Sequence, residues 1–147
     1  MTTIPIWFAT PDLKALNGLN KNTLGESIGL EFTEVGSDFI VGTIPVDERT
    51  KQPFGLLHGG ASVSLAETLG SVASMMVVDM EKFIAVGIEI NANHIKAVMG
   101  GKVTGVCKAL SVSGRTHIWD IKIYNEDKEL SCISRFTCAI VPRSKFQ

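Results

Sequence analysis

The chain has 147 residues and a mass of 15.8 kDa, and 45% of its residues are hydrophobic while 20% are charged. A chain of this length can bury roughly 68–70% of its unfolded surface in one core, so we expect a single domain over residues 1–147. The apolar content and the net charge of −1 exclude disorder, and no basic or acidic block suggests nucleic acid or a membrane surface as a partner. The charged share lies below the usual quarter, which suggests surface hidden in an oligomer.

Targeting and metal signals are missing from the sequence. The segment from Met1 to Phe8 has neither the basic region nor the apolar core of a signal peptide. The cysteines Cys107, Cys132 and Cys138 are odd in number and lack metal-ligand spacing. We therefore expect a cytoplasmic protein with no metal site, whose cysteines pack on strands as small hydrophobic residues.

Short elements are predicted in the first third of the chain. Residues 12–18 form a short helix, preceded by Pro11 and ended by Gly18. Residues 30–35 and 39–46 alternate apolar and polar side chains around Gly-Ser-Asp at 36–38, which predicts a hairpin.

The next element is a long apolar stretch at residues 59–78, about as long as a membrane-spanning helix. However, Glu67 lies near its middle, and several serines and a threonine dilute it. A helix that is buried on most sides in a water-soluble fold fits this pattern better, with Gly and Ala allowing neighbours to approach closely.

Four strands follow, separated by residues typical of turns. Their ranges are 84–95, 101–112, 115–124 and 129–141. Consecutive hairpins predict a largely antiparallel sheet, and that sheet must cover the apolar helix. We therefore expect an α+β fold in which a long helix is wrapped by a curved antiparallel sheet.

The first chemical signal precedes the long helix, in the run Gln-Pro-Phe-Gly-Leu-Leu-His-Gly-Gly-Ala-Ser from Gln52 to Ser62. Gly59 and Gly60 leave the unpaired N–H groups of the first turn open to a ligand. A carbonyl oxygen that gains negative charge would be stabilised there. The alternative is an ordinary helix start that uses glycine for its geometry. Gln52 and His58 flank this start, and His58 is either an acid/base group or a histidine that orders the turn.

Glu67 is the second signal, because a carboxylate in an apolar helix is costly to bury without partners or a purpose. Burial would raise its pKa and make it a better base or nucleophile near neutral pH. The alternative is a glutamate on a solvated stripe. The positions three, four and seven residues away hold Gly, Val and Ser, which suits a narrow cleft better than open water.

Glu67 lies eight residues after Gly59, or about 12 Å along a helix axis at ~1.5 Å per residue. It therefore cannot serve a carbonyl held at its own helix start. An antiparallel second copy of the helix would bring Glu67 of one chain beside Gly59 of the other, which predicts a site across a twofold interface. Ser71, one turn beyond Glu67, is placed to hold a water against the carboxylate.

These motifs resemble the hotdog-fold acyl-CoA thioesterases, in particular the bacterial 1,4-dihydroxy-2-naphthoyl-CoA and 4-hydroxybenzoyl-CoA subgroup. The resemblance covers residues 13–141 and is carried by the run from Gln52 to Ser62, Leu65-Ala-Glu-Thr, Gly70-Ser and Gly87-Ile-Glu-Ile-Asn-Ala-Asn-His94. It implies a long helix wrapped by an antiparallel sheet, as the elements predict.

The resemblance also implies roles for single residues. Glu67 would be the nucleophile or general base, the Gly59 N–H would polarise the thioester carbonyl, Gln52 and His58 would align it, and Ser71 would place the water. Coenzyme A, as part of the substrate, would be bound by Gly87, by His94, Ile95, Lys96 and Ala97, and by Ser111, Val112, Ser113, Gly114, Arg115 and Thr116. No separate cofactor is implied. The family implies a homotetramer, a dimer of dimers with its active sites at the dimer interface.

Two other functions are compatible with the same fold. A non-catalytic acyl-CoA-binding sensor would not need Glu67 and usually carries an appended DNA-binding segment. A dehydratase for hydroxyacyl thioesters needs a His–Asp or His–Glu pair, and His58 and Glu67 would meet only across a dimer. The acyl group stays open, with menaquinone biosynthesis, aromatic degradation and proofreading of aryl-loaded carriers as alternatives.

Overall fold

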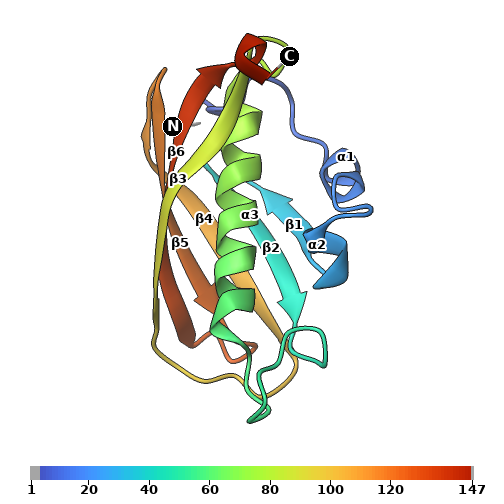
Figure 1. Cartoon of the computed structure of the whole chain (residues 1–147). Coiled ribbons are helices and arrows are strands. Elements are labelled where there is room, and N and C mark those ends of the chain that lie inside the picture. Colours follow the sequence, from blue (N-terminus) through green and yellow to red (C-terminus); the bar gives the residue numbers. More distant parts are fainter. Residues whose placement is uncertain (1–3, 147) are drawn as a thin grey trace.

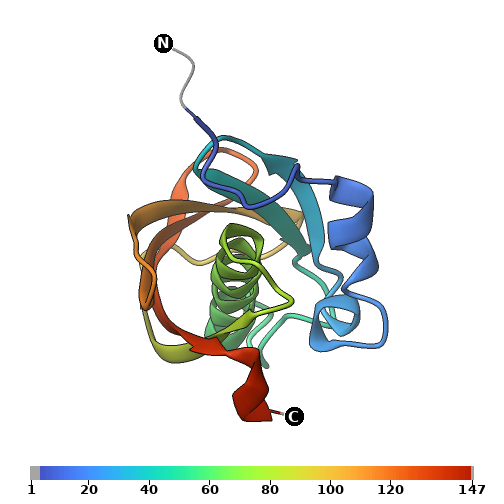
Figure 2. The same cartoon turned by 90° about the horizontal axis from the view of Figure 1, so that it is seen from above.

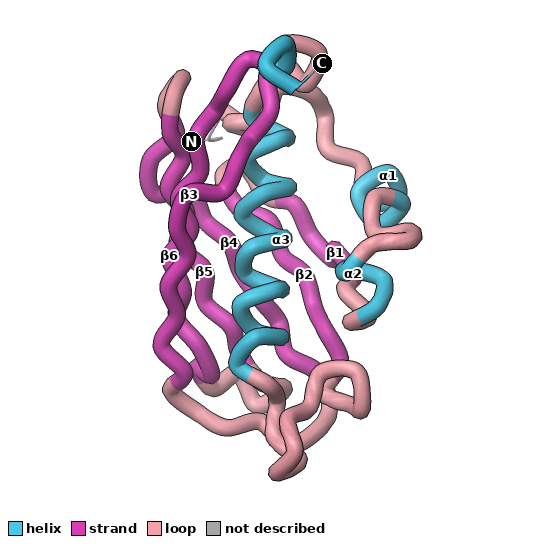
Figure 3. The backbone as a smooth tube through the Cα atoms, in the orientation of Figure 1, coloured by secondary structure: helices cyan, strands magenta, loops and turns pink. Residues whose placement is uncertain are grey.

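The structure is a computed structural model that describes residues 4–146. One long helix lies within a curved sheet (Figures 1 and 3). The elements in chain order are α1 (Leu13–Gly18), α2 (Leu24–Ser27), β1 (Glu31–Val35), β2 (Phe39–Pro45), α3 (Gly59–Val77), β3 (Phe83–His94), β4 (Lys102–Val112), β5 (Thr116–Tyr124), β6 (Leu130–Pro142) and the 3₁₀ helix η1 (Arg143–Phe146).

The sheet has six strands in the order β1-β2-β4-β5-β6-β3, and every neighbouring pair is antiparallel. The hairpins β1–β2, β4–β5 and β5–β6 confirm three predicted turns. The prediction of consecutive hairpins is wrong between β3 and β4, because β3 pairs with β6 instead. The connection after β3 therefore crosses one end of the sheet, and β3 becomes an edge strand.

Helix α3 lies inside the curve of the sheet, as the view along its axis shows (Figure 2). Leu65 and Leu69 are fully buried and face β2 and β4. A Cβ on Gly105 of β4 would come within 2.8 Å of Leu69 Cδ1, so this glycine permits the close approach of helix and sheet. The described core is thus the layer between one helix and one sheet, which confirms the predicted α+β class.

The two short helices lie on the far side of β1 from the rest of the sheet (Figure 1). Asp12 caps α1 by accepting a hydrogen bond from the Lys14 N–H at 2.9 Å. The Asn17 side chain both donates to the Phe32 carbonyl and accepts from the Phe32 N–H, at 2.9 and 2.8 Å, which ties α1 to β1. Neither α2 nor η1 was predicted.

The helix predicted at residues 59–78 corresponds to α3, and α3 is covered by protein as expected. Between residues 4 and 146, no helix is long and apolar enough to cross a membrane. The three cysteines are buried and unpaired in this part of the chain, on β4 and β6, as predicted.

Candidate active site

The start of α3 is built by the loop that precedes it. His58 is the N-cap, and its Nδ1 accepts a hydrogen bond from the Gly60 N–H at 2.8 Å. The Gln52 side-chain oxygen accepts from the Phe54 N–H, and the Gln52 carbonyl accepts from the Gly55 N–H at 2.9 Å. His58 thus orders the turn, which is one of the two roles left open for it.

The Gly59 N–H remains available at this helix start. Within residues 4–146 no acceptor takes a hydrogen bond from it. The His94 ring lies directly against Gly59, since a Cβ on that glycine would come within 2.8 Å of His94 Nε2. Gly59 and His94 line a cavity of about 360 Å³ together with Gln52 and residues 95–98. A backbone donor, an amide and an imidazole therefore converge on one small cavity.

Glu67 lies two turns further along α3 and faces β3. A Cβ on Gly87 would come within 2.8 Å of Glu67 Oε1 and 3.3 Å of Phe136 Cε2. Within the described chain the carboxylate has neither an ion-pair nor a hydrogen-bond partner. Desolvation by burial raises the pKa of Glu67 above the ordinary glutamate value. This carboxylate is half-buried, has no partner among the described residues and lies beside Gly87.

Ser71 follows Glu67 by one turn and is also half-buried. Its hydroxyl makes no hydrogen bond within residues 4–146, in contrast to Ser64 and Thr68, whose hydroxyls donate back to their own helix at 2.8 and 2.7 Å. The hydroxyl of Ser71 is therefore free to bind water beside the carboxylate.

Lys96 lies in an ion pair that the sequence did not suggest. Its Nζ lies 2.5 Å from Glu129 Oε1, and Asn125 holds the other oxygen of that carboxylate through Nδ2 at 2.8 Å. The hydrogen bonds from Lys96 and Asn125 lower the pKa of Glu129, so the carboxylate stays charged. Ser131 fixes the backbone of the same turn, because its carbonyl accepts from the N–H groups of Ile95 and Lys96.

The turn between β4 and β5 is closed by Ser113. Its hydroxyl donates to the Thr116 carbonyl at 2.8 Å and accepts from the Thr116 N–H at 3.0 Å. Gly114 and Arg115 at the tip are exposed, as are Ser111 and Val112 on the strand before it. The single hydroxyl proton of Ser113 is therefore used within the turn.

One chain does not bring all of the expected coenzyme A residues together. On β6, Thr116 pairs with Ala139 whereas His94 pairs with Cys132. These positions are seven residues apart, or roughly 23 Å at ~3.3 Å per residue. Figure 1 shows the β4–β5 hairpin at one end of the sheet and the connection after β3 at the other. Gly59 and Glu67 are likewise about 12 Å apart along α3 at ~1.5 Å per residue.

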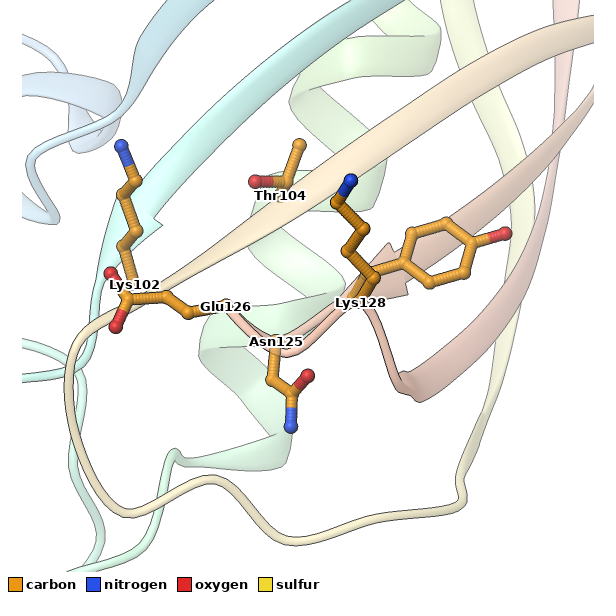
Figure 4. Close-up of a pocket in the computed structure, with 6 residues that line it drawn as sticks. Lys102, Thr104, Asn125, Glu126 and Lys128 are labelled. Carbon is orange, nitrogen blue, oxygen red and sulfur yellow. The ribbon is translucent and has the colours of Figure 1, made fainter.

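A further depression of about 590 Å³ lies on the outer face of the sheet, with α3 behind the strands (Figure 4). It is lined by Lys102, Thr104, Tyr124, Asn125, Glu126 and Lys128. None of these residues was predicted from the sequence to belong to a functional site, and the sheet separates them from Glu67.

Sequence reasoning missed Phe136 and Glu129 as neighbours of the site. Phe136 is buried on β6 and its ring lies against Gly70 of α3, where a Cβ would meet Phe136 Cδ1 at 2.4 Å. Strand alternation predicts that Phe136 faces the core, but it does not tell which helical residue the ring meets. Glu129 lies in a polar turn, 33 residues from Lys96, and no local pattern marks that pair.

Comparisons with known proteins place this site in a family. A model of the thioesterase superfamily matches residues 54–132. The 1,4-dihydroxy-2-naphthoyl-CoA hydrolase of Escherichia coli is 46% identical over 92% of this chain and 99% of its own. The proofreading thioesterase EntH of Cronobacter turicensis is also 46% identical, over 92% of this chain and 98% of its own.

Solved structures agree with these relatives. A mutant thioesterase from Pseudomonas aeruginosa superposes with a TM-score of 0.92 at 47% identity, covering 93% of this chain and 99% of that one. A thioesterase from Haemophilus influenzae gives a TM-score of 0.90 at 42% identity, covering 93% and 95%. The suspected family and fold are confirmed: the chain belongs to the thioesterase superfamily, adopts the hotdog fold and is an enzyme that hydrolyses thioesters.

Proposed function

We propose that this enzyme hydrolyses acyl-CoA thioesters with aromatic or other bulky acyl groups, such as 1,4-dihydroxy-2-naphthoyl-CoA, to the free acid and coenzyme A. The observation that carries the proposal is the unpaired Glu67 carboxylate beside Gly87. The relatives named above, which include a naphthoyl-CoA hydrolase, support the substrate class. The reaction uses the protein's own groups and water, without a separate cofactor.

Glu67 is the reacting group in this proposal. As a general base it takes a proton from a water held by Ser71, the water oxygen bonds to the thioester carbon, and the C–S bond breaks as the thiol leaves with a proton. As a nucleophile it forms the bond itself, the thiol leaves, and water hydrolyses the resulting anhydride. Its raised pKa makes it a stronger base in the first route and a better nucleophile in the second.

The start of α3 binds the carbonyl that Glu67 attacks. The free Gly59 N–H, at the positive end of the helix dipole, donates to the oxygen as it gains charge. Gln52 has its oxygen engaged in the loop, which leaves its amide NH₂ to donate. His58 keeps the turn in shape through its bond to Gly60.

The active site then needs two protomers, because Gly59 and Glu67 are too far apart on one helix. β3 offers the surface for a twofold dimer. It is an edge strand with an unpaired side, and it exposes apolar side chains at Phe83, Val86 and Ile88, the last of them 63% exposed. Two antiparallel copies of α3 would place Glu67 of one protomer beside Gly59 of its partner. Two such dimers form the homotetramer that we expect of the family.

Assembly also reunites the residues expected to bind coenzyme A. In one chain, Gly87 and Thr116 lie close to each other, because their partners on β6 are the neighbouring residues Cys138 and Ala139. The segment that begins at His94 lies at the other end of β6, where His94 pairs with Cys132. Lys96 and Arg115 supply positive charge, and the Gly114 N–H with the Ser111 and Thr116 hydroxyls supplies further donors, which suits phosphate groups. A cytoplasmic location stays a prediction.

The test is release of free thiol from a panel that includes benzoyl-CoA and 1,4-dihydroxy-2-naphthoyl-CoA. We expect turnover of the aryl thioesters by the wild type and its loss in Glu67→Ala, while the matched exposed carboxylate variant Glu34→Gln keeps full activity. Full turnover by Glu67→Ala would refute the role of this carboxylate. Faster turnover of short aliphatic thioesters would refute the substrate class.

Mixing two inactive variants tests the shared site. In a dimer of one Glu67→Gln protomer and one Gln52→Ala protomer, one site would combine the intact Glu67 with the intact Gln52. We expect unfolding and refolding of the mixture to recover activity that neither variant has alone. If the mixture stays as inactive as its parents, the site lies within one chain.

A further inference from the structure

Gly87 lies on an extended strand where its backbone does not need glycine. Its φ lies outside the left-handed region, unlike those of Gly29, Gly55 and Gly101, so an alanine could adopt the same backbone. What an alanine would meet is a side chain. The added Cβ would lie 2.8 Å from Glu67 Oε1 and 3.3 Å from Phe136 Cε2.

The strand is also irregular at this point. Gly87 pairs with Cys138 and Glu89 pairs with Thr137, so Ile88 is an extra residue without a partner on β6. Such a β-bulge bends a strand and re-aims its side chains, and bulges recur beside active sites. Here the bulge lies directly after the glycine that faces the carboxylate.

We propose that Gly87 is a positioning residue for Glu67: its missing side chain leaves the space beside β3 in which the carboxylate lies. This inference rests on the proposed catalytic role of Glu67. It differs from a role of Gly87 in binding coenzyme A, because it predicts an effect on turnover rather than on substrate binding.

The packing around Gly87 determines which side chain an added methyl group would displace. The Phe136 ring is buried and fixed between β6 and Gly70 of α3, where even a methyl group would find no room. The Glu67 carboxylate is the end of a flexible side chain with no partner to hold it. A methyl group at Gly87 would therefore displace the carboxylate and leave helix, sheet and ring in place.

The Gly87→Ala variant tests the positioning role of Gly87 directly. We expect kcat to fall on the order of 10- to 100-fold, because misplacing a reacting group by ~1 Å can cost about 10²-fold, while KM changes by less than about threefold. The control is Gly18→Ala, where an added Cβ meets nothing within 4 Å, and its kcat and KM should match the wild type. Size-exclusion chromatography and the Tm verify that both variants assemble and fold.

A double-mutant cycle tests whether Gly87→Ala lowers turnover through Glu67 or independently of it. In the Glu67→Gln background, Gly87→Ala should cause no further loss in single-turnover rate, since the group that it displaces is already inactive. An equal loss in both backgrounds, or a rise in KM with kcat unchanged, would overturn the positioning role. If Glu67→Gln itself retains turnover, the proposed function fails instead, which is a distinct result.

Two measurements do not depend on activity. The ¹³C NMR signal of the Glu67 carboxyl should titrate at lower pH in Gly87→Ala than in the wild type, because a displaced carboxylate is better hydrated. An unchanged titration would contradict the contact. If Gly87→Ala fails to assemble, adding Glu67→Ala removes the conflicting side chain and should restore assembly, and continued failure would overturn the proposal.

Discussion

Glu67 and Ser74 are polar side chains on the same face of α3, two turns apart, yet their surroundings differ. Ser74 is 0% exposed and fully bonded: its Oγ accepts from Trp119 Nε1 at 2.7 Å and lies 2.9 Å from Cys138 Sγ. Glu67 has no partner among the described residues and a raised pKa. Buried polar groups are normally hydrogen-bonded. The bonded serine therefore has a structural role, whereas the unpaired carboxylate points to chemistry.

The variant Glu67→Gln tests the difference between the two side chains most strongly, because it keeps the shape of Glu67 and removes the base. We expect kcat to fall by about 10²–10⁴-fold, the usual contribution of general acid–base catalysis, with no loss of Tm. Thiol release and thermal unfolding measure the two effects. A glutamine variant that unfolds at lower temperature but turns over normally would make Glu67 structural, like Ser74.

The reverse outcome is expected for Ser74→Ala. It leaves the Trp119 N–H buried without an acceptor, which should lower the free energy of unfolding by about 1–3 kcal/mol while kcat changes little. Denaturant titration gives the stability. Ser64→Ala is the matched control on the same helix, because its hydroxyl bonds only to the Gly60 carbonyl, and it should be nearly neutral.

The pH dependence of activity and of stability also distinguishes Glu67 from Ser74. Burial raises the pKa of Glu67, so the carboxyl binds its proton more tightly in the folded enzyme than in the unfolded chain. As the pH falls, kcat/KM should therefore begin to decrease at a pH above the ordinary glutamate pKa. As the pH rises through the pKa of Glu67 in the folded enzyme, the stability that its protonation confers should be lost.

Glu67→Gln should therefore be more stable than the wild type at neutral pH, with the difference shrinking in acid. Tm values of both proteins across the pH range measure this. A difference that is constant with pH would show that the carboxyl titrates as an ordinary, solvated group.

Much of this architecture was predictable because it is local. The Gly-Ser-Asp turn at 36–38 and the capped run after Pro11 predict a hairpin and a helix at nearly the observed bounds. The pairing of β3 with β6 was not predictable, because strands separated by more than 30 residues carry no turn signal for each other. The four-residue helix α2 is too short to show a helical period.

The candidate site divides in the same way. Glu67 stands out in sequence as the one charge in an apolar helix, and Gly59 as a glycine at a helix start. Phe136, whose ring lies near both Gly70 and Gly87, does not stand out, since one buried aromatic residue on an alternating strand looks like any other. Its contact with Gly70 exists only after helix and sheet have packed.

The smallest expected effect concerns Lys96, which is paired with Glu129 although we expect it to meet a substrate phosphate. Asn125 holds Glu129 in place, so a phosphate must compete with a fixed carboxylate for one ammonium group. Removing that competitor in Glu129→Gln should lower the KM for acyl-CoA on the order of twofold to fivefold, the range of exposed ion pairs, and leave kcat unchanged.

N-acetylcysteamine thioesters, which lack phosphates, should show no change in KM. Glu126→Gln is the matched control in the same turn. An equal effect on both substrates would mean that Glu129 acts on the fold of the turn rather than on the charge of Lys96.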